Sequence, residues 1–204
     1  MNLFQEALIK RFGAKNINVH STSNISFSKL TVSSTGRKGV TFYMTSGLSA
    51  YEQPATEKNK AHKHIELVFC LPSYWDLNND IQTMNWVKTW IEKLGNHLLE
   101  KQTWYGDGHT FANGNPIEPL SPTMNQKYLM LVEPDFFATE LSPIKIENKE
   151  VHFLCVIPLF EDEFDFKMGK GTFKLKKKLR DKGINELLDD FRMTALKNKW
   201  RIFK

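Results

Sequence analysis

The stretch I-E-L-V-F-C-L-P, residues 65–72, is apolar at nearly every position, with Glu66 as the exception. Apolar residues at successive positions, rather than at every second one, are typical of a strand that is covered on both faces of a sheet. Pro72 has no backbone N–H to donate to a neighbouring strand and is expected to end this one. The stretch therefore predicts a central strand with a layer of structure packed on each side.

Other parts of the chain predict neighbours for this strand. V-H-F-L-C-V-I-P-L at residues 151–159 has the same buried character, and Y-L-M-L-V at residues 128–132 is a shorter run of the same kind. Short β-prone stretches at residues 25–27, 30–32 and 40–43 are punctuated by Ser and Gly, which is typical of strands and turns.

Helical periodicity marks four segments. Residues 2–12 place apolar side chains on one side, and Gly13 is expected to end that helix. The clearest helix begins near Asn79 or Asp80, because apolar residues then recur every three or four positions: Met84, Val87, Ile91, Leu94 and Leu98. Two more helices are expected at residues 172–181 and 184–191. Together these segments predict one mixed sheet with helices packed on it.

Composition excludes several classes of protein. Hydrophobic residues make up 41% of the 204-residue chain and charged residues 25%, as in ordinary globular proteins and unlike disordered or disulfide-scaffold chains. No apolar run approaches the roughly 20 residues of a membrane helix, and no signal-peptide pattern is present. We therefore expect a soluble cytoplasmic protein with no membrane contact.

The net charge of +5 divides unevenly along the chain. Residues 167–204 hold 13 Lys and Arg against four acids, a net of +9, whereas the other 166 residues net −4. A basic segment of this kind can contact phosphates. Lys176, Lys177 and Lys178, however, fall mostly on other helical faces than Leu175 and Leu179, as a solvent-facing side would. Nucleic-acid binding through this segment therefore ranks only as a second alternative function.

Patterns of catalytic chemistry are weak. His62 and His64 lie one residue apart in a charged loop without a zinc-like spacing of further ligands, so no metal site is expected. Cys70 and Cys155 each sit in an apolar run, where a cysteine usually serves as a small buried side chain rather than as a nucleophile or a disulfide partner. There is no G-x-S-x-G motif and no phosphate-binding loop. We expect no catalytic residue, no cofactor and no small-molecule substrate.

Two stretches keep an enzyme open as the first alternative. The acids Glu161, Asp162, Glu163 and Asp165 follow a strand directly; the simplest interpretation is a solvated loop, but paired carboxylates there could serve acid–base or metal chemistry. T-W-Y-G-D-G-H-T-F at residues 103–111 gathers aromatic rings, an acid and a histidine between glycines, which is typical of a structural loop or of a recognition loop. A metal-dependent or hydrolytic enzyme would use Asp107 and His109 together with these acids.

Several stretches in order resemble the suppressor of fused domain family, over residues 39–192. The matching pieces are T-S-G-L-S at 45–49, I-E-L-V-F-C-L-P-S-Y-W at 65–75, W-x3-W-x3-L-G at 86–95, Y-G-D-G-H at 105–109, Y-L-M-L at 128–131, V-H-F-L-C-V-I-P-L-F-E-D-E at 151–163 and L-L-x3-R at 187–192. The resemblance is to single-domain bacterial members, which are similar to immunity proteins of toxin systems.

The resemblance implies a fold class and a function. The fold is α+β, a mixed and largely antiparallel sheet flanked by helices, in a single domain over residues 1–204 with a basic extension at residues 193–204. The function is non-enzymatic: the domain binds another protein, here a cognate toxin that it neutralises. In animal members a second domain follows, and a Gli peptide adds as a strand between the two domains; a chain of this length is not expected to bind in that way.

The resemblance also implies a partner-binding surface. The family's peptide-contacting acid corresponds to Asp107, although Gly108 is an extra glycine before His109. A contact tyrosine of the preceding helix falls at His97 when one residue is deleted. A glycine-rich loop can also present an acceptor carboxylate beside a strand edge that takes a partner's backbone. The expected partner-binding residues are Trp104, Tyr105, Asp107, His109 and His97.

Overall fold

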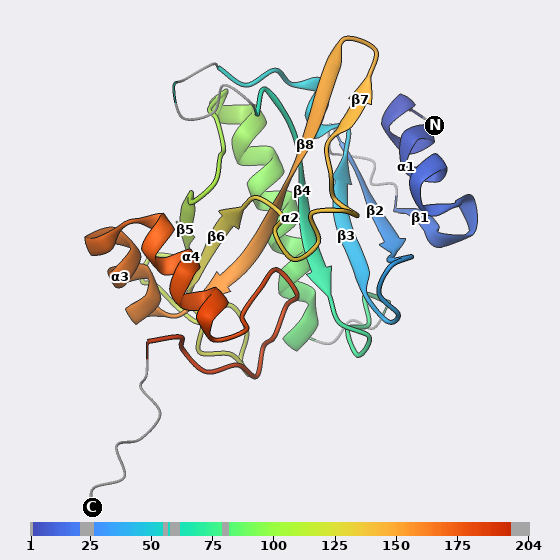
Figure 1. Cartoon of the computed structure of the whole chain (residues 1–204). Coiled ribbons are helices and arrows are strands. Elements are labelled where there is room, and N and C mark those ends of the chain that lie inside the picture. The colour runs from blue at the N-terminus through green and yellow to red at the C-terminus, as the bar shows by residue number, and fades with distance from the viewer. Residues whose placement is uncertain (1, 21–26, 55–56, 58–61, 79–81, 197–204) are drawn as a thin grey trace, which may run out of the picture.

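The computed structural model describes residues 2–20, 27–54, 57, 62–78 and 82–196 (Figure 1). Its helices are α1 (Leu3–Phe12), α2 (Gln82–Lys101), α3 (Glu161–Lys170) and α4 (Thr172–Asp181). Its strands are β1 (Ile17–His20), β2 (Ser28–Ser33), β3 (Thr41–Ser46), β4 (His64–Leu71), β5 (Thr110–Ala112), β6 (Tyr128–Val132), β7 (Ile144–Ile146) and β8 (Lys149–Leu159).

The strands form one mixed sheet in the order β1-β2-β3-β4-β8-β6-β5, with β7 paired to the start of β8. Only β4 and β8 run parallel among these pairs, with His64 opposite Val151 and Val68 opposite Cys155; the other pairs are antiparallel. This confirms the expected α+β class with a mixed, largely antiparallel sheet.

Two cores lie on opposite faces of the sheet, as alternation along β4 shows. Leu67 and Phe69 join the core that contains α2, whereas Val68 and Cys70 join the core that contains α1 and α4. Figure 1 shows α2 behind the sheet, with α1 and the α3–α4 hairpin at opposite ends of its front. All eight residues of β4 are buried. The prediction of a central strand with both faces covered is therefore confirmed.

The sequence predicted a solvated loop for the acids after β8, and this prediction is wrong. The acids belong to α3, with Glu161, Asp162 and Glu163 in its first turn. The Glu163 carboxylate accepts a hydrogen bond from the N–H of Phe160, which caps the helix, and Glu161 and Asp162 add negative charge where the helix dipole is positive. Glu163 itself is fully buried. These acids therefore mark the N-terminus of a helix, where negative charge is stabilising.

The predicted helix at residues 184–191 is also wrong. Gly183 has a φ of +73° and follows the end of α4, and the chain then continues as irregular structure that meets the end of β4. Leu187 forms a bridge with Cys70, and the N–H of Leu188 donates to the Cys70 carbonyl at 2.8 Å. The end of β4 extends past its pairing with β8 and accepts this segment, so a tertiary hydrogen bond overrides local helical spacing.

The remaining predictions of helices and strands are confirmed for the longer elements and failed for the short strands. The helices at residues 2–12 and 172–181 and the strand at 128–132 are confirmed almost to the residue. Strands β1, β5 and β7 have three or four residues each and were missed. The proposed helix caps Asn79 and Asp80, and residues 25–26 of one expected strand, lie outside the described residues.

Candidate functional site

The loop at residues 103–111, which follows α2, is anchored to the rest of the fold by Tyr105, whose surface is 1% exposed. Its hydroxyl lies 3.0 Å from the Leu94 carbonyl and 2.9 Å from His97 Nδ1, both on α2. Gln53 binds its backbone on both sides, accepting from the Tyr105 N–H at 2.6 Å and donating to the carbonyl at 3.2 Å. Burial raises the pKa of the Tyr105 hydroxyl, which therefore remains a neutral structural group.

Four of the five residues expected at the partner surface lie together around this anchor. The His97 ring is parallel to that of Tyr105, with 6.1 Å between ring centroids, and the rings of Trp104 and His109 lie 4.2 Å apart. His97 is exposed, and Trp104 and His109 are partly exposed. These three rings are therefore accessible on the surface, while Tyr105 is buried beneath them.

Asp107 lies on the side of the loop that faces α4. Its Oδ1 accepts from Lys176 Nζ at 2.8 Å and from the N–H of Glu133 at 3.1 Å. The carboxylate thus joins the loop to α4 and to the residue after β6. The residue is exposed as a whole, and 29% of its side-chain surface remains accessible beside these two contacts.

The extra glycine of the loop has a structural reason. Gly108 has a φ of +85°, and a Cβ there would lie 2.4 Å from Thr172 Oγ1, at the start of α4. The Gly108 N–H donates to the Leu131 carbonyl at 2.7 Å, and the Leu131 N–H donates to the backbone carbonyl of His109 at 2.8 Å. Glycine lets the loop extend the β5–β6 pairing while α4 packs directly on it.

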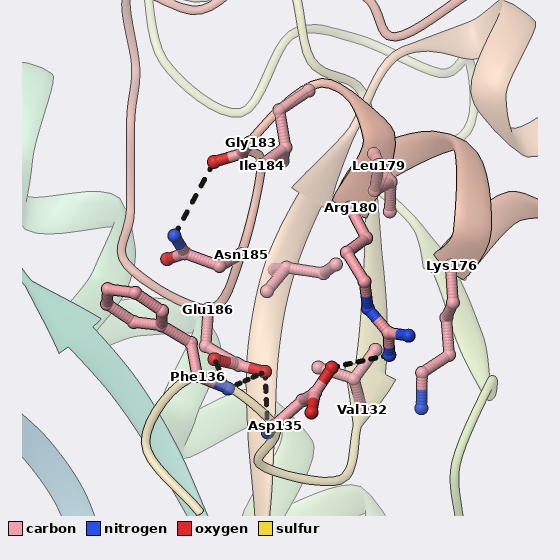
Figure 2. A pocket seen from close by; sticks show the side chains of 11 residues that line it. Val132, Asp135, Phe136, Lys176, Leu179, Arg180, Gly183, Ile184, Asn185 and Glu186 are labelled. Atoms are coloured by element: carbon pink, nitrogen blue, oxygen red, sulfur yellow. Dashed lines mark hydrogen bonds and ion pairs between the residues drawn. The ribbon is translucent and has the colours of Figure 1, made fainter.

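A hollow of about 640 Å³ opens next to Lys176 (Figure 2). Its apolar wall comes from four elements: Val132 ends β6, Ile157 is on β8, Leu179 is on α4 and Ile184 follows α4. Lys176 and Arg180 of α4 line it together with Asp135, Phe136 and Glu186. Because Lys176 also binds Asp107, the loop and the hollow belong to one face of the molecule.

Charges around the hollow are already paired. Figure 2 shows Arg180 facing Asp135 in an exposed ion pair. The Glu186 carboxylate is directed to the backbone, accepting from the N–H of Asp135 at 2.8 Å and of Phe136 at 3.0 Å. Glu186 thereby holds the 135–136 turn that forms one wall. Sequence reasoning missed this site, because it placed Glu186 in a helix and read α4 only as a helix with a charged, solvent-facing side.

The acids proposed for an alternative enzyme do not line this hollow, and neither do Asp107 and His109. Glu161 pairs with Lys127 at 2.8 Å, Asp162 accepts from Thr194, and Glu163 pairs with Arg192. These carboxylates are occupied in tying α3 to its surroundings.

Histidines and cysteines form no metal cluster within the described residues, where no group of three or more potential ligands gathers. His64 binds the Ser49 carbonyl, and the rings of His62 and His152 meet at 4.8 Å. Cys70 and Cys155 are free, with their sulfurs 3.9 Å apart. Burial raises the pKa of the Cys70 thiol, which opposes thiolate chemistry.

Among the helices that the structure describes, none combines the length and the hydropathy needed to cross a membrane.

Comparison with known proteins places the chain in a family. A family model described as Suppressor of fused protein (SUFU) matches residues 14–192. A curated relative, "Immunity protein YqcF" of Bacillus subtilis (strain 168), is 25% identical over 162 residues, which is 79% of this chain and 78% of the relative.

Solved structures show the same fold at low sequence identity. A SUFU homologue from Neisseria gonorrhoeae FA 1090 matches with a TM-score of 0.69 and 14% identity, covering 97% of both chains. A chain of the Sufu–Fu complex matches with a TM-score of 0.64 and 15% identity over 94% of this chain and 90% of that one. Drosophila Suppressor of Fused gives a TM-score of 0.53 and 15% identity, and there the match covers 88% of this chain but 42% of the fly protein.

Proposed function

The chain belongs to the suppressor of fused family, and from this premise we propose that it is an immunity protein, a cytoplasmic module that binds a cognate toxin and neutralises it. Family members bind other proteins, as the Sufu–Fu complex illustrates, and the curated relative YqcF is an immunity protein. A toxin is proposed as the partner because of the similarity to that relative.

The observation that carries the proposal is the construction of the loop at residues 103–111. Tyr105 and Gly108 hold its backbone against the rest of the fold, and this leaves the exposed Asp107 and the partly exposed Trp104 and His109 on the surface. Strand β5 follows directly and ends the sheet order, so its outer edge pairs with no other strand of the described residues. A rigid aromatic loop beside a free strand edge suits recognition of a polypeptide, because the edge can take backbone hydrogen bonds while the side chains give specificity.

The test is binding and neutralisation by a charge-reversed loop. The tagged chain captures its partner in the source cells, and affinity for the purified partner is then measured for the parent, Asp107→Arg and the control Glu6→Arg. Glu6 is exposed on α1, at the other end of the sheet, and undergoes the same charge change. We expect Asp107→Arg to weaken binding at least tenfold and to abolish protection of cells that express the partner, with Glu6→Arg unchanged.

Circular dichroism and thermal unfolding show whether Asp107→Arg is folded, since Lys176 and the Glu133 N–H lose their shared acceptor. A folded Asp107→Arg protein that binds its partner with parental affinity would show that the loop is not the interface. A captured partner with no toxic activity would remove the immunity role and leave a binding module.

A further inference from the structure

The α3–α4 hairpin carries a strong local charge beside the hollow. Residues 167–182 hold eight Lys and Arg and one Asp, a net of +7 in a chain of +5. Three of these cations have acidic partners: Lys176 with Asp107, Lys177 with Asp181 and Arg180 with Asp135. The structure gives no ion pair within its described part to the other five, which are Lys167, Lys170, Lys174, Lys178 and Lys182.

The hollow beside this charge is floored by aliphatic side chains. Val132, Ile157, Leu179 and Ile184 come from four different elements and leave about 640 Å³ between them, within the range of ligand-binding clefts. Phe136 stands at the rim with 39% of its surface exposed. Burial of a partner's apolar side chain against these four residues is favourable. The four aliphatic side chains have no hydrogen-bonding group that could read the edge of a nucleic-acid base.

The charged rim can open at little cost. Arg180 and Asp135 have side chains that are 68% and 60% exposed, and an exposed pair of this kind contributes roughly 0–1 kcal/mol. A partner carboxylate can therefore replace Asp135 on Arg180. The Glu186 carboxylate repels such a partner carboxylate only weakly, because it already accepts hydrogen bonds from the backbone N–H groups of Asp135 and Phe136.

We infer that the hollow and the exposed face of α4 bind an acidic polypeptide segment that inserts one aliphatic or aromatic side chain between Ile184 and Leu179. This inference rests on the proposed function and specifies its partner: the segment belongs to the protein that the chain neutralises. Its flanking carboxylates meet Arg180 and Lys176, the two cations that line the hollow, and the other lysines of the hairpin add attraction at longer range. Binding therefore weakens as salt screens the charges.

Two labelled peptides test the inference on the full chain. One carries Asp and Glu on both sides of a single Leu; the matched peptides replace the Leu by Asn, or the acids by Lys. Binding is followed by fluorescence anisotropy and by backbone chemical shifts of the 15N-labelled protein. We expect saturable binding of the acidic Leu peptide, at least tenfold weaker binding of both matched peptides, and shifts confined to residues 132–136, 157 and 176–186.

Variants of the rim separate this site from the loop. Arg180→Glu and Ile184→Asp should each weaken binding of the acidic Leu peptide at least tenfold. Lys15→Glu, an exposed charge reversal just before β1 at the other end of the sheet order, should leave binding unchanged. Thermal unfolding confirms that each variant is folded. If Ile184→Asp fails to fold, the result for Arg180→Glu still tests the inference, because the Arg180 side chain is exposed and its replacement should leave the fold intact.

Several results would overturn the inference. These are absence of saturable shifts at millimolar peptide, equal binding of the Asn or Lys peptide, or tighter binding of a single-stranded DNA oligonucleotide, which would assign the basic face to nucleic acid. Self-association that Arg180→Glu abolishes would assign the hollow to a second copy. A captured partner that is sensitive to Asp107→Arg but not to Arg180→Glu would leave the proposed function standing and reject this site.

Discussion

Glu163 and Arg192 show how single residues join distant parts of this chain. The Glu163 side chain has no exposed surface and that of Arg192 has 6%, and both Glu163 oxygens lie 2.7 Å from guanidinium nitrogens. Arg192 also donates to the Pro158 carbonyl, and Glu163 accepts from the N–H of Ala195. One ion pair therefore joins the end of β8, the start of α3 and the segment at residues 192–195.

Removing one member of this pair should be costly. Arg192→Ala leaves a buried carboxylate without its cation, and we expect a loss of about 3–5 kcal/mol in the free energy of unfolding, measured by urea denaturation. The double variant Glu163→Gln/Arg192→Met should lose less, because it leaves no unpaired charge.

The exposed pair of Lys177 with Asp181 is the matched control, and Lys177→Ala should cost at most about 0.5 kcal/mol. Equal losses for Arg192→Ala and Lys177→Ala would contradict the assignment of Glu163 and Arg192 as a buried structural pair.

His152 should make stability depend on pH. Its ring meets His62, and its Nε2 lies 3.3 Å from Glu150, while His62 lies 3.2 Å from Glu133. Burial, followed by the nearby His62, lowers the pKa of His152 despite these two acids.

Because the folded chain holds the His152 proton less tightly than the unfolded chain does, stability falls as pH drops below about 6.5, the usual histidine pKa. We expect the free energy of unfolding of His152→Asn to fall less steeply between pH 7 and pH 5 than that of the parent. The difference in slope is at most about 1.4 kcal/mol per pH unit, the limit for one proton. Chemical unfolding at each pH measures it. Parallel curves for parent and variant would show that His152 does not titrate differently in the folded state.

At the scale of elements, α2 illustrates how a sequence pattern and a close approach combine. Val87, Ile91, Leu94 and Leu98 are at most 1% exposed, as their spacing predicted. Gly95 lies beside this stripe, and a Cβ there would lie 2.2 Å from the Phe27 ring. The helix can therefore pack against Phe27 only because residue 95 has no side chain.

Two glycine-to-alanine changes should have opposite effects. Gly95→Ala improves helix propensity but forces Phe27 to move, and we expect a net loss of about 1–3 kcal/mol. Gly169→Ala on α3, where a Cβ would meet nothing within 4 Å, should gain about 0.5–1 kcal/mol. Urea unfolding of both variants measures the difference, and a stabilising Gly95→Ala would show that Phe27 moves at no cost.

At the scale of the whole molecule, the sheet has a protected centre and two exposed edges. Strand β4 lies between β3 and β8 and is covered on both faces, whereas β1 and β5 end the sheet. The proposed recognition elements gather at the β5 end, so they lie apart from the protected centre of the sheet.

Hydrogen exchange should reproduce this division. We expect the amides of Val68 and Leu154 to exchange only through global unfolding, and those of Asn18 and Phe111 to exchange through local opening with much smaller free energies. Exchange followed by NMR measures each amide. Equal protection of β4 and β5 would indicate that the β5 edge is covered in solution.

The limits of prediction follow from which interactions each feature needs. Leu175 and Leu179 could be assigned to the buried side of α4 from spacing alone, since periodicity is local. Glu186 could not be assigned to a turn, because its partners are backbone groups at residues 135 and 136. The loop at residues 103–111 stood out by composition, yet its division into an anchor, Tyr105, and a surface, Trp104 and His109, needed α2 beside it.

The sequence alone therefore determined the central strand, the main helices, the fold class and the family, because apolar runs, helical spacing and motif order are written along the chain. The tertiary structure alone decided that Glu163 belongs to a buried ion pair, that Leu187 and Leu188 pair with the end of β4, and that β6, β8, α4 and the segment after it enclose a hollow beside Asp107. Each of these depends on groups tens of residues apart, whose burial and pairing have no signature in local pattern.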